Sequence, residues 1–161
     1  MDQNLKEYME ENNIEYKTHK HLPVFTVEEH YKLMGQIKGV LHTKNLFLRS
    51  EKGNLYLVSM YANKRLDMKM LSRKIRSGKL SFASPNQLKF HLNLTPGSVS
   101  IFGMIYAKSV ILILDKQVWD AEKVGFHPNI NTSTLEITHE NLEKFYNTLK
   151  SQKLIVDLDH N

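Results

Sequence analysis

Two groups of polar residues have types and spacing that could do chemistry. Lys44 and Asn45 stand directly before the apolar run 46–48, at the mouth of a candidate strand. A lysine placed there can point into a cleft, although a solvated side chain is the simpler interpretation. The segment 127–132 brings imidazole, amide and hydroxyl groups together in His127, Asn129, Asn131 and Thr132. Such a loop is either a turn held by Asx-type hydrogen bonds or a loop that reads a ligand.

The motifs of several other chemistries are missing. The chain has 8 histidines but no cysteine, which excludes disulfides, thiolate metal sites and thiol nucleophiles. No two histidines form a His-x-x-x-His pair, and neither glycine-rich phosphate motif occurs. Ser98 and Ser100 lie near Gly97 and Gly103, but not in the Gly-x-Ser-x-Gly pattern of serine hydrolases. We therefore expect no metal site and no cofactor.

Basic residues are concentrated in residues 64–79. The net charge of the whole chain is a modest +5, but Asp67 is the one acidic residue in this segment. An apolar stripe of helical period predicts a helix from an Asp67 N-cap to a Gly78 C-cap. A separate face carries the cations Lys69, Arg73 and Arg76. This ridge matches phosphate spacing, but an ordinary solvated helix face explains it equally well.

The elements that must position these groups are helices and strands in mixed order. Helices are predicted at residues 5–12, from the capping box at Thr26 towards Gly35 or Gly39, from a second capping box at Ser84 to before Pro96, and from the N-cap Thr138 to about residue 150. Strands are predicted at 14–19, 45–49, 55–59, 80–83, 98–102, 109–114, near 135 and at 154–158. Several strand pairs are joined too tightly for helical crossovers, which favours an α+β fold with a mixed, largely antiparallel sheet.

Length and hydropathy limit the number of domains and the class of protein. A chain of 161 residues with no repeat or linker predicts one domain over residues 1–161. No stretch approaches the roughly 20 apolar residues that cross a bilayer, and the first residues do not resemble a secretory signal. We therefore expect a cytoplasmic protein that does not contact membranes.

Four ordered blocks give the sequence a family resemblance. They are residues 44–49, 80–84, 96–100, and 126–129 with Asn131 and Thr132, and the capping box 26–29 fits the same pattern. Together they resemble the YbaK/ProX family of aminoacyl-tRNA deacylases, the freestanding relatives of the editing domain of bacterial prolyl-tRNA synthetases. The resemblance extends from about residue 5 to 150. The most similar branch is the alanyl-tRNA(Pro) trans-editing deacylases.

The resemblance implies an editing-domain-like fold with a barrel-like sheet and packed helices. It also implies hydrolysis of mischarged tRNA, with alanyl-tRNA(Pro) as the expected substrate, by attack of water without a metal or a covalent intermediate. The partners implied are the acceptor end of the tRNA and, beyond it, prolyl-tRNA synthetase.

The resemblance also assigns residues to roles. The catalytic group is Lys44, Gly97, Ser98 and His127. The substrate-binding group is Thr26, Asn45, Ile101, Asn129, Asn131 and Thr132. The tRNA-binding group, on the basic segment, is Arg65, Lys69, Arg73, Arg76 and Lys79.

One departure from the family pattern concerns the amino-acid pocket. Ile101 stands where many members carry a proline four residues after the loop glycine, and proline would stiffen the loop by fixing φ. Serine and cysteine therefore remain alternative mischarged amino acids. A tRNA-binding module without turnover, or an unrelated small-molecule enzyme on the same fold, are the competing functions.

Overall fold

The computed structural model describes residues 2–130 and 132–159. Its helices are α1 (Gln3–Glu11), α2 (Val27–Gln36), α3 (Met68–Ile75), α4 (Pro85–Leu92), α5 (Lys116–Asp120), α6 (His139–Thr148) and the 3₁₀ helix η1 (Ile101–Tyr106). Its strands are β1 (Lys17–Lys20), β2 (Leu41–Ser50), β3 (Leu55–Tyr61), β4 (Leu80–Phe82), β5 (Val110–Asp115), β6 (Lys123–Phe126), β7 (Ser133–Thr138) and β8 (Lys153–Val156). Within these residues, no helix is both long enough and apolar enough to span a membrane.

The strands form one mixed sheet. Its order is β1-β7-β6-β2-β3-β5-β8, and β4 pairs with β2 beside this path. The pairings of β2 with β6, β3 with β5 and β5 with β8 are parallel, and the other described pairings are antiparallel. The predicted α+β class, with a mixed sheet and packed helices, is confirmed. The sheet is open and not barrel-like as the resemblance implied, since β1 and β8 end the path. Parallel pairing is a larger part of the sheet than the short connections indicated.

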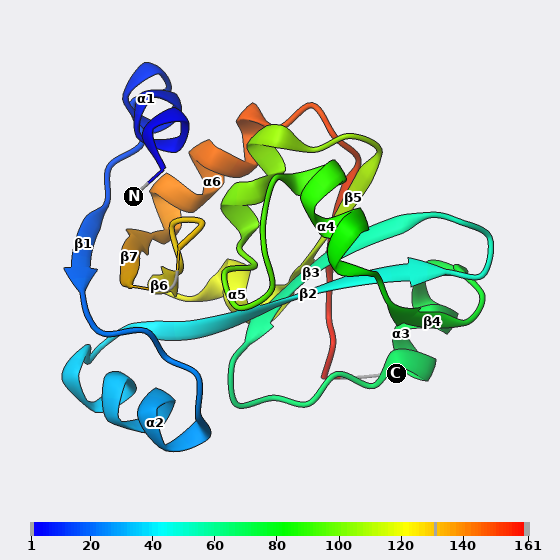
Figure 1. Cartoon of the computed structure of the whole chain (residues 1–161), viewed down its shortest axis with the longest axis horizontal. Helices are drawn as coiled ribbons and strands as arrows, with labels where there is room; N and C mark the ends of the chain where they lie inside the picture. Colours follow the sequence, from blue (N-terminus) through cyan, green and yellow to red (C-terminus); the bar gives the residue numbers. More distant parts are fainter. Residues whose placement is uncertain (1, 131, 160–161) are drawn as a thin grey trace.

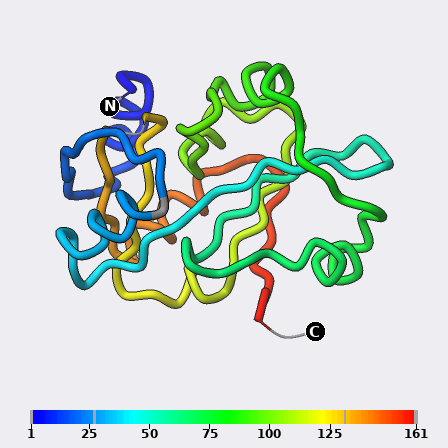
Figure 2. Tube along the Cα trace, turned by 60° about the horizontal axis from the view of Figure 1, so that its bottom comes forward, coloured from blue at the N-terminus to red at the C-terminus, as the bar shows by residue number. Residues whose placement is uncertain are grey.

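Strands β2 and β3 organise the interior. They run side by side across the molecule to a turn that projects at one end (Figures 1 and 2). Because side chains alternate along a strand, each of the two contributes to two cores. Phe47 and Leu57 belong to the larger core with α1 and α6, and Leu48 and Val58 to the smaller core with α3. Lys44 and Asn45 are neighbours on β2 and therefore belong to opposite faces of the sheet.

Helix starts follow local capping chemistry. Both predicted capping boxes are present: Thr26 with Glu29 opens α2, and Ser84 with Gln87 opens α4. Asp67 caps α3 as predicted, with its side chain accepting from the Met70 N–H. These interactions satisfy N–H groups that the first turn of a helix leaves unpaired.

The end of α3 differs from the prediction. Arg76, not Gly78, is the C-cap, and it adopts the left-handed conformation with φ of 54°. The N–H groups of Arg76 and Ser77 both bond the Ser72 carbonyl, which closes the helix two residues earlier. Arg76 therefore lies beyond the helical ridge that contains Lys69 and Arg73.

The strand predicted at residues 98–102 is wrong. Ser98 and Val99 are irregular, and the chain then enters η1. The Ser100 side chain accepts from the Phe102 N–H and starts this 3₁₀ turn, so the short polar and apolar alternation was misleading. Helix α5 and strand β6 have no counterpart in the prediction.

Candidate functional site

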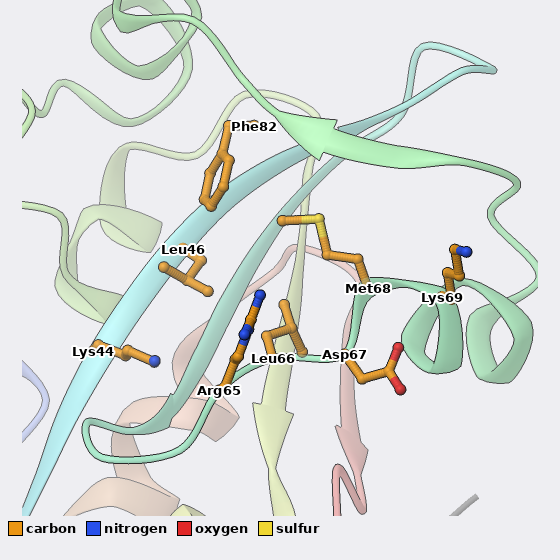
Figure 3. Close-up of a pocket in the computed structure, with 8 residues that line it drawn as sticks. All are labelled: Lys44, Leu46, Arg65, Leu66, Asp67, Met68, Lys69 and Phe82. Carbon is orange, nitrogen blue, oxygen red and sulfur yellow. The ribbon is translucent and has the colours of Figure 1, made fainter.

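One cavity of the structure contains the predicted site residue Lys44. It has a volume of about 740 Å³. Its lining comes from β2, the loop before α3, the start of α3, and β4 (Figure 3). The lining residues are Lys44, Leu46, Arg65, Leu66, Asp67, Met68, Lys69 and Phe82.

Lys44 is the half-buried cation of this cavity. Its ammonium points towards the side where Arg65 lies (Figure 3), and among the described residues it has no hydrogen bond or ion pair. Burial lowers the pKa of Lys44, because the surrounding protein solvates the charge less well than water does. Such an unpaired, poorly solvated charge binds an anion more strongly than a surface lysine does. The side chain can therefore hold a phosphate or stabilise a developing oxyanion.

The charge around the cavity is positive. Arg65 and Lys69 are exposed at its rim. The one acidic lining residue, Asp67, directs its carboxylate towards the α3 backbone, where Oδ1 accepts from Met70 N at 3.0 Å. Figure 3 shows this carboxylate turned away from Lys44. The rim is therefore suited to a negatively charged ligand.

The basic segment separates into structural and exposed cations. Lys64 Nζ lies 2.8 Å from Asp115 Oδ2, and Lys74 Nζ donates to the Asp157 carbonyl. The five residues that the family resemblance assigned to tRNA are all exposed, and none has an ion pair or side-chain hydrogen bond within the described part of the chain. They are Arg65, Lys69, Arg73, Arg76 and Lys79.

The second group of predicted residues meets at a different place. The Ser100 hydroxyl donates to the His127 carbonyl, which joins the glycine loop to the loop after β6. Gly97 adopts φ of +89°, which favours glycine, and the Ser98 N–H closes this turn onto the Thr95 carbonyl at 3.1 Å. Among the described residues, no hydrogen bond or ion pair connects this group to Lys44.

His127 is a half-buried histidine in that group. Its Nδ1–H donates to the Ser133 carbonyl at 3.1 Å. Burial lowers the pKa of His127, and the neighbouring His21 and His42 lower it further against the effect of that bond. The imidazole is therefore neutral at neutral pH, so it can orient a ligand without adding a charge.

The two described asparagines predicted to bind substrate both have buried acceptors. The Oδ1 atoms of Asn45 and Asn129 are buried without a hydrogen-bond partner, which is costly unless a ligand or water satisfies them. Asn129 has a φ of 64°, and its Nδ2 lies 3.4 Å from Asp2 Oδ2. Asn131 lies outside the described residues.

The remaining predicted substrate residues have other local roles. Ile101 is fully buried in the larger core. Thr26 is exposed and occupied by its capping box. The side chain of Thr132 is exposed, and its carbonyl accepts from the His21 N–H at 2.9 Å. None of the three lines the Lys44 cavity.

Sequence reasoning missed that His21, His30 and His42 lie near one another or near His127. The rings of His30 and His42 lie 6.2 Å apart, as do those of His21 and His127. Burial is the main cause that lowers the pKa of both His30 and His42. Their positions on α2, β2 and the neighbouring loops have no common spacing that would have revealed them. Among the described residues, no group of three or more histidine, aspartate or glutamate side chains has an arrangement suited to a metal ion.

The comparison with known families decides the identity of the chain. Residues 21–145 match the family described as the aminoacyl-tRNA editing domain. The chain belongs to this family. The editing-domain match includes β2, the Lys44 cavity, the glycine loop and the loop after β6, and it confirms the family resemblance.

Individual relatives are consistent with the assignment of the chain to the editing-domain family. The chain is 40% identical over 154 residues to the prolyl-tRNA editing protein ProX of Acetoanaerobium sticklandii, with 91% of this chain and 93% of the relative aligned. It is 30% identical to the prolyl-tRNA synthetase associated domain-containing protein 1 of Danio rerio, over 96% of this chain and 86% of that protein. A solved structure described as a candidate trans-editing enzyme for prolyl tRNA synthetase has a TM-score of 0.73 and 18% identity, over 100% of this chain and 99% of the other. The prediction of an aminoacyl-tRNA editing enzyme is thus confirmed, whereas the roles of individual residues stay predictions.

Proposed function

We propose that this chain hydrolyses the ester bond of mischarged tRNA(Pro), with alanyl-tRNA(Pro) as the preferred substrate. The observation that carries the proposal is Lys44, an unpaired and half-buried cation in a cavity whose rim is basic. The printed names of the relatives, which refer to prolyl-tRNA editing, support the choice of tRNA. The proposed location is the cytoplasm, with prolyl-tRNA synthetase as a further partner.

The proposed reaction is direct attack by water on the ester carbonyl. An aminoacyl ester is already activated, so orientation of water and stabilisation of the developing oxyanion suffice. Lys44 supplies positive charge to the ester or the adjoining phosphate. The backbone of the glycine loop at Gly97 and Ser98 contacts the aminoacyl moiety, and neutral His127 shapes the pocket. The C–O bond to the ribose breaks, and the products are free amino acid and uncharged tRNA.

The proposed discrimination is by size. An apolar pocket separates amino acids that differ by a methylene or two by only about 1–3 kcal/mol, whereas steric exclusion of a larger ring can be sharper. Ile101 packs into the larger core behind the glycine loop, so it acts through the position of that loop. Alanine is therefore preferred over proline, and serine and cysteine are the next candidates.

The test is single-turnover hydrolysis of alanyl-tRNA(Pro) beside prolyl-tRNA(Pro). We expect release of alanine with proline spared, and a loss of at least about a hundredfold in Lys44→Ala with unchanged thermal unfolding. Lys116→Ala is the matched control, since Lys116 is an exposed lysine of α5 away from the cavity. Unchanged turnover in Lys44→Ala would overturn the role of that residue. If neither ester is cleaved, a panel with seryl- and cysteinyl-tRNA separates a different amino acid from a tRNA-binding module.

A further inference from the structure

Phe82 is an exposed aromatic side chain in the wall of the Lys44 cavity. It extends from β4 with 59% of its surface exposed. Phe90 on α4 is similarly exposed, at 65%, but its ring already has partners: Lys108 Nζ lies 4.9 Å from its centroid and the His91 ring lies beside it. Among the described residues, Phe82 has no ring or cation contact of this kind. Its open ring is therefore available to a ligand.

The side chains around Phe82 form a slot for a flat group. Figure 3 shows the Phe82 ring and the Arg65 guanidinium directed into the cavity from opposite sides, with Leu46 and Met68 at its flanks. A phenyl ring and a guanidinium plane are both surfaces on which a base can stack. The flanking apolar side chains replace water around such a base.

The charges of the cavity identify the class of ligand. A flat ring between Phe82 and Arg65 would lie between the cations Lys44 and Lys69, which stand at opposite ends of the cavity (Figure 3). Aromatic stacking beside a basic groove is how proteins bind single-stranded nucleic acid. The single-stranded part of a tRNA acceptor end is its 3′ terminus, which ends in adenosine.

We propose that Phe82 stacks on the 3′-terminal adenine of the tRNA, with Arg65 on the other face of the base. This inference rests on the proposed function, because it makes the aminoacyl adenosine the occupant of the cavity. Lys44 and Leu46 are two residues apart on one face of β2, a separation of about 7 Å along the strand. The base therefore lies over Leu46 and Phe82, and the ribose ester lies at Lys44.

The experiment measures binding of an uncharged RNA hairpin with a single-stranded CCA end. A second hairpin is identical but lacks the terminal base. For the wild-type chain we expect binding of the CCA hairpin about tenfold to a hundredfold tighter than that of the abasic hairpin. Phe82→Ala should bind both hairpins equally weakly. Phe82→Trp should restore the preference, because indole is also a stacking surface, and Phe90→Ala should behave as wild type.

The outcomes separate the stacking role from the proposed function. A full preference for the terminal base in Phe82→Ala would overturn the inference, as would an equal loss in Phe90→Ala. Since this assay uses uncharged RNA, it is independent of ester cleavage. Hydrolysis by the wild type together with an unchanged Phe82→Ala preference would overturn the stacking alone. Absence of hydrolysis together with a Phe82-dependent preference would overturn the proposed reaction and leave the base site supported.

Discussion

The hydroxyl of Ser100 is bonded to the main-chain carbonyl of His127, so the two loops predicted to contact the aminoacyl group are fastened to each other. Ser100 is fully buried and also accepts from the Phe102 N–H, at 3.1 Å. One side chain thus fixes both the start of η1 and the path of the chain after β6. Movement of the glycine loop would therefore displace His127.

Replacing Ser100 should destabilise the chain through this connection. Ser100→Ala removes the partner of the half-buried His127 carbonyl and of the buried Phe102 N–H, and we expect a loss of about 1–3 kcal/mol in the free energy of unfolding. Chemical denaturation measures it. Ser98→Ala is the control, because the Ser98 side chain is half-exposed and makes no side-chain hydrogen bond in the described structure. Equal stability of the two variants would contradict the fastening role.

One buried and two half-buried histidines predict that the stability of the chain is sensitive to acid. The pKa values of His30, His42 and His127 are all lowered, with burial as the main cause. Below a pH of about 6.5 the unfolded chain therefore binds more protons than the folded chain, and stability falls as the pH falls. We expect a lower urea midpoint at pH 5.5 than at pH 7.5.

A variant separates the contribution of the histidines to this pH dependence from that of the acidic residues, which also titrate in acid. The Nε2 of His30 is buried without a partner, so His30→Leu removes a titrating group without breaking a hydrogen bond there. Its midpoint should change less between the two pH values than that of the wild type. His91→Leu, outside the histidine group, is the control. The same pH dependence in all three proteins would refute the explanation.

The Lys64–Asp115 pair should be costly to break. Asp115 is fully buried, and Lys64 also lies 2.7 Å from Asp159 near the end of the described chain. Lys64→Met leaves the Asp115 carboxylate without its cation, for which we expect about 3–5 kcal/mol of destabilisation. The control is Lys116→Met, which breaks an exposed pair with Asp120 and should have no measurable effect. Thermal unfolding of both variants makes the comparison.

The exposed arginines at the end of α3 should contribute affinity that depends on salt. Arg73→Ala with Arg76→Ala removes two cations that have no partner in the described structure, so tRNA binding should weaken at low salt. The slope of log affinity against log salt should become shallower by about one to two units. Lys116→Ala with Lys123→Ala removes the same charge elsewhere and should leave the slope as it is. Equal slopes for both double variants would indicate that net charge alone acts.

Much of the local structure could be predicted, because it depends on contacts within a few residues. Thr26, Asp67, Ser84 and Thr138 all cap helices as their spacing indicated, since a cap needs only the following turn. The strand predicted at residues 98–102 was wrong because the structure there depends on a contact outside the segment. The bond from Ser100 to His127 joins residues that are distant in the sequence, and no local alternation contains it.

The candidate site was predictable only in part. The place of Lys44 before an apolar strand allowed a cleft position but favoured a solvated side chain, and it was the family resemblance that assigned Lys44 to the site. The basic segment was recognised from its charge. Phe82 could be recognised as a candidate site residue only from the pairing of β4 with β2. This pairing puts Phe82 opposite Leu48, on the face of the sheet that carries Lys44. Leu46 carried no signal beyond its strand, because an apolar residue on β2 is equally consistent with a core position.

The cavity around Lys44 has one property that concerns folding kinetics. Every residue that lines it comes from the single stretch between Lys44 and Phe82, whereas β2 must also pair with β6, which follows much later in the chain. Contacts close in sequence form faster than distant ones, because closing a short loop costs less entropy. We therefore expect the β2–β3 hairpin, α3 and β4 to form early in folding, so that the Lys44 cavity assembles before the loop of His127 docks.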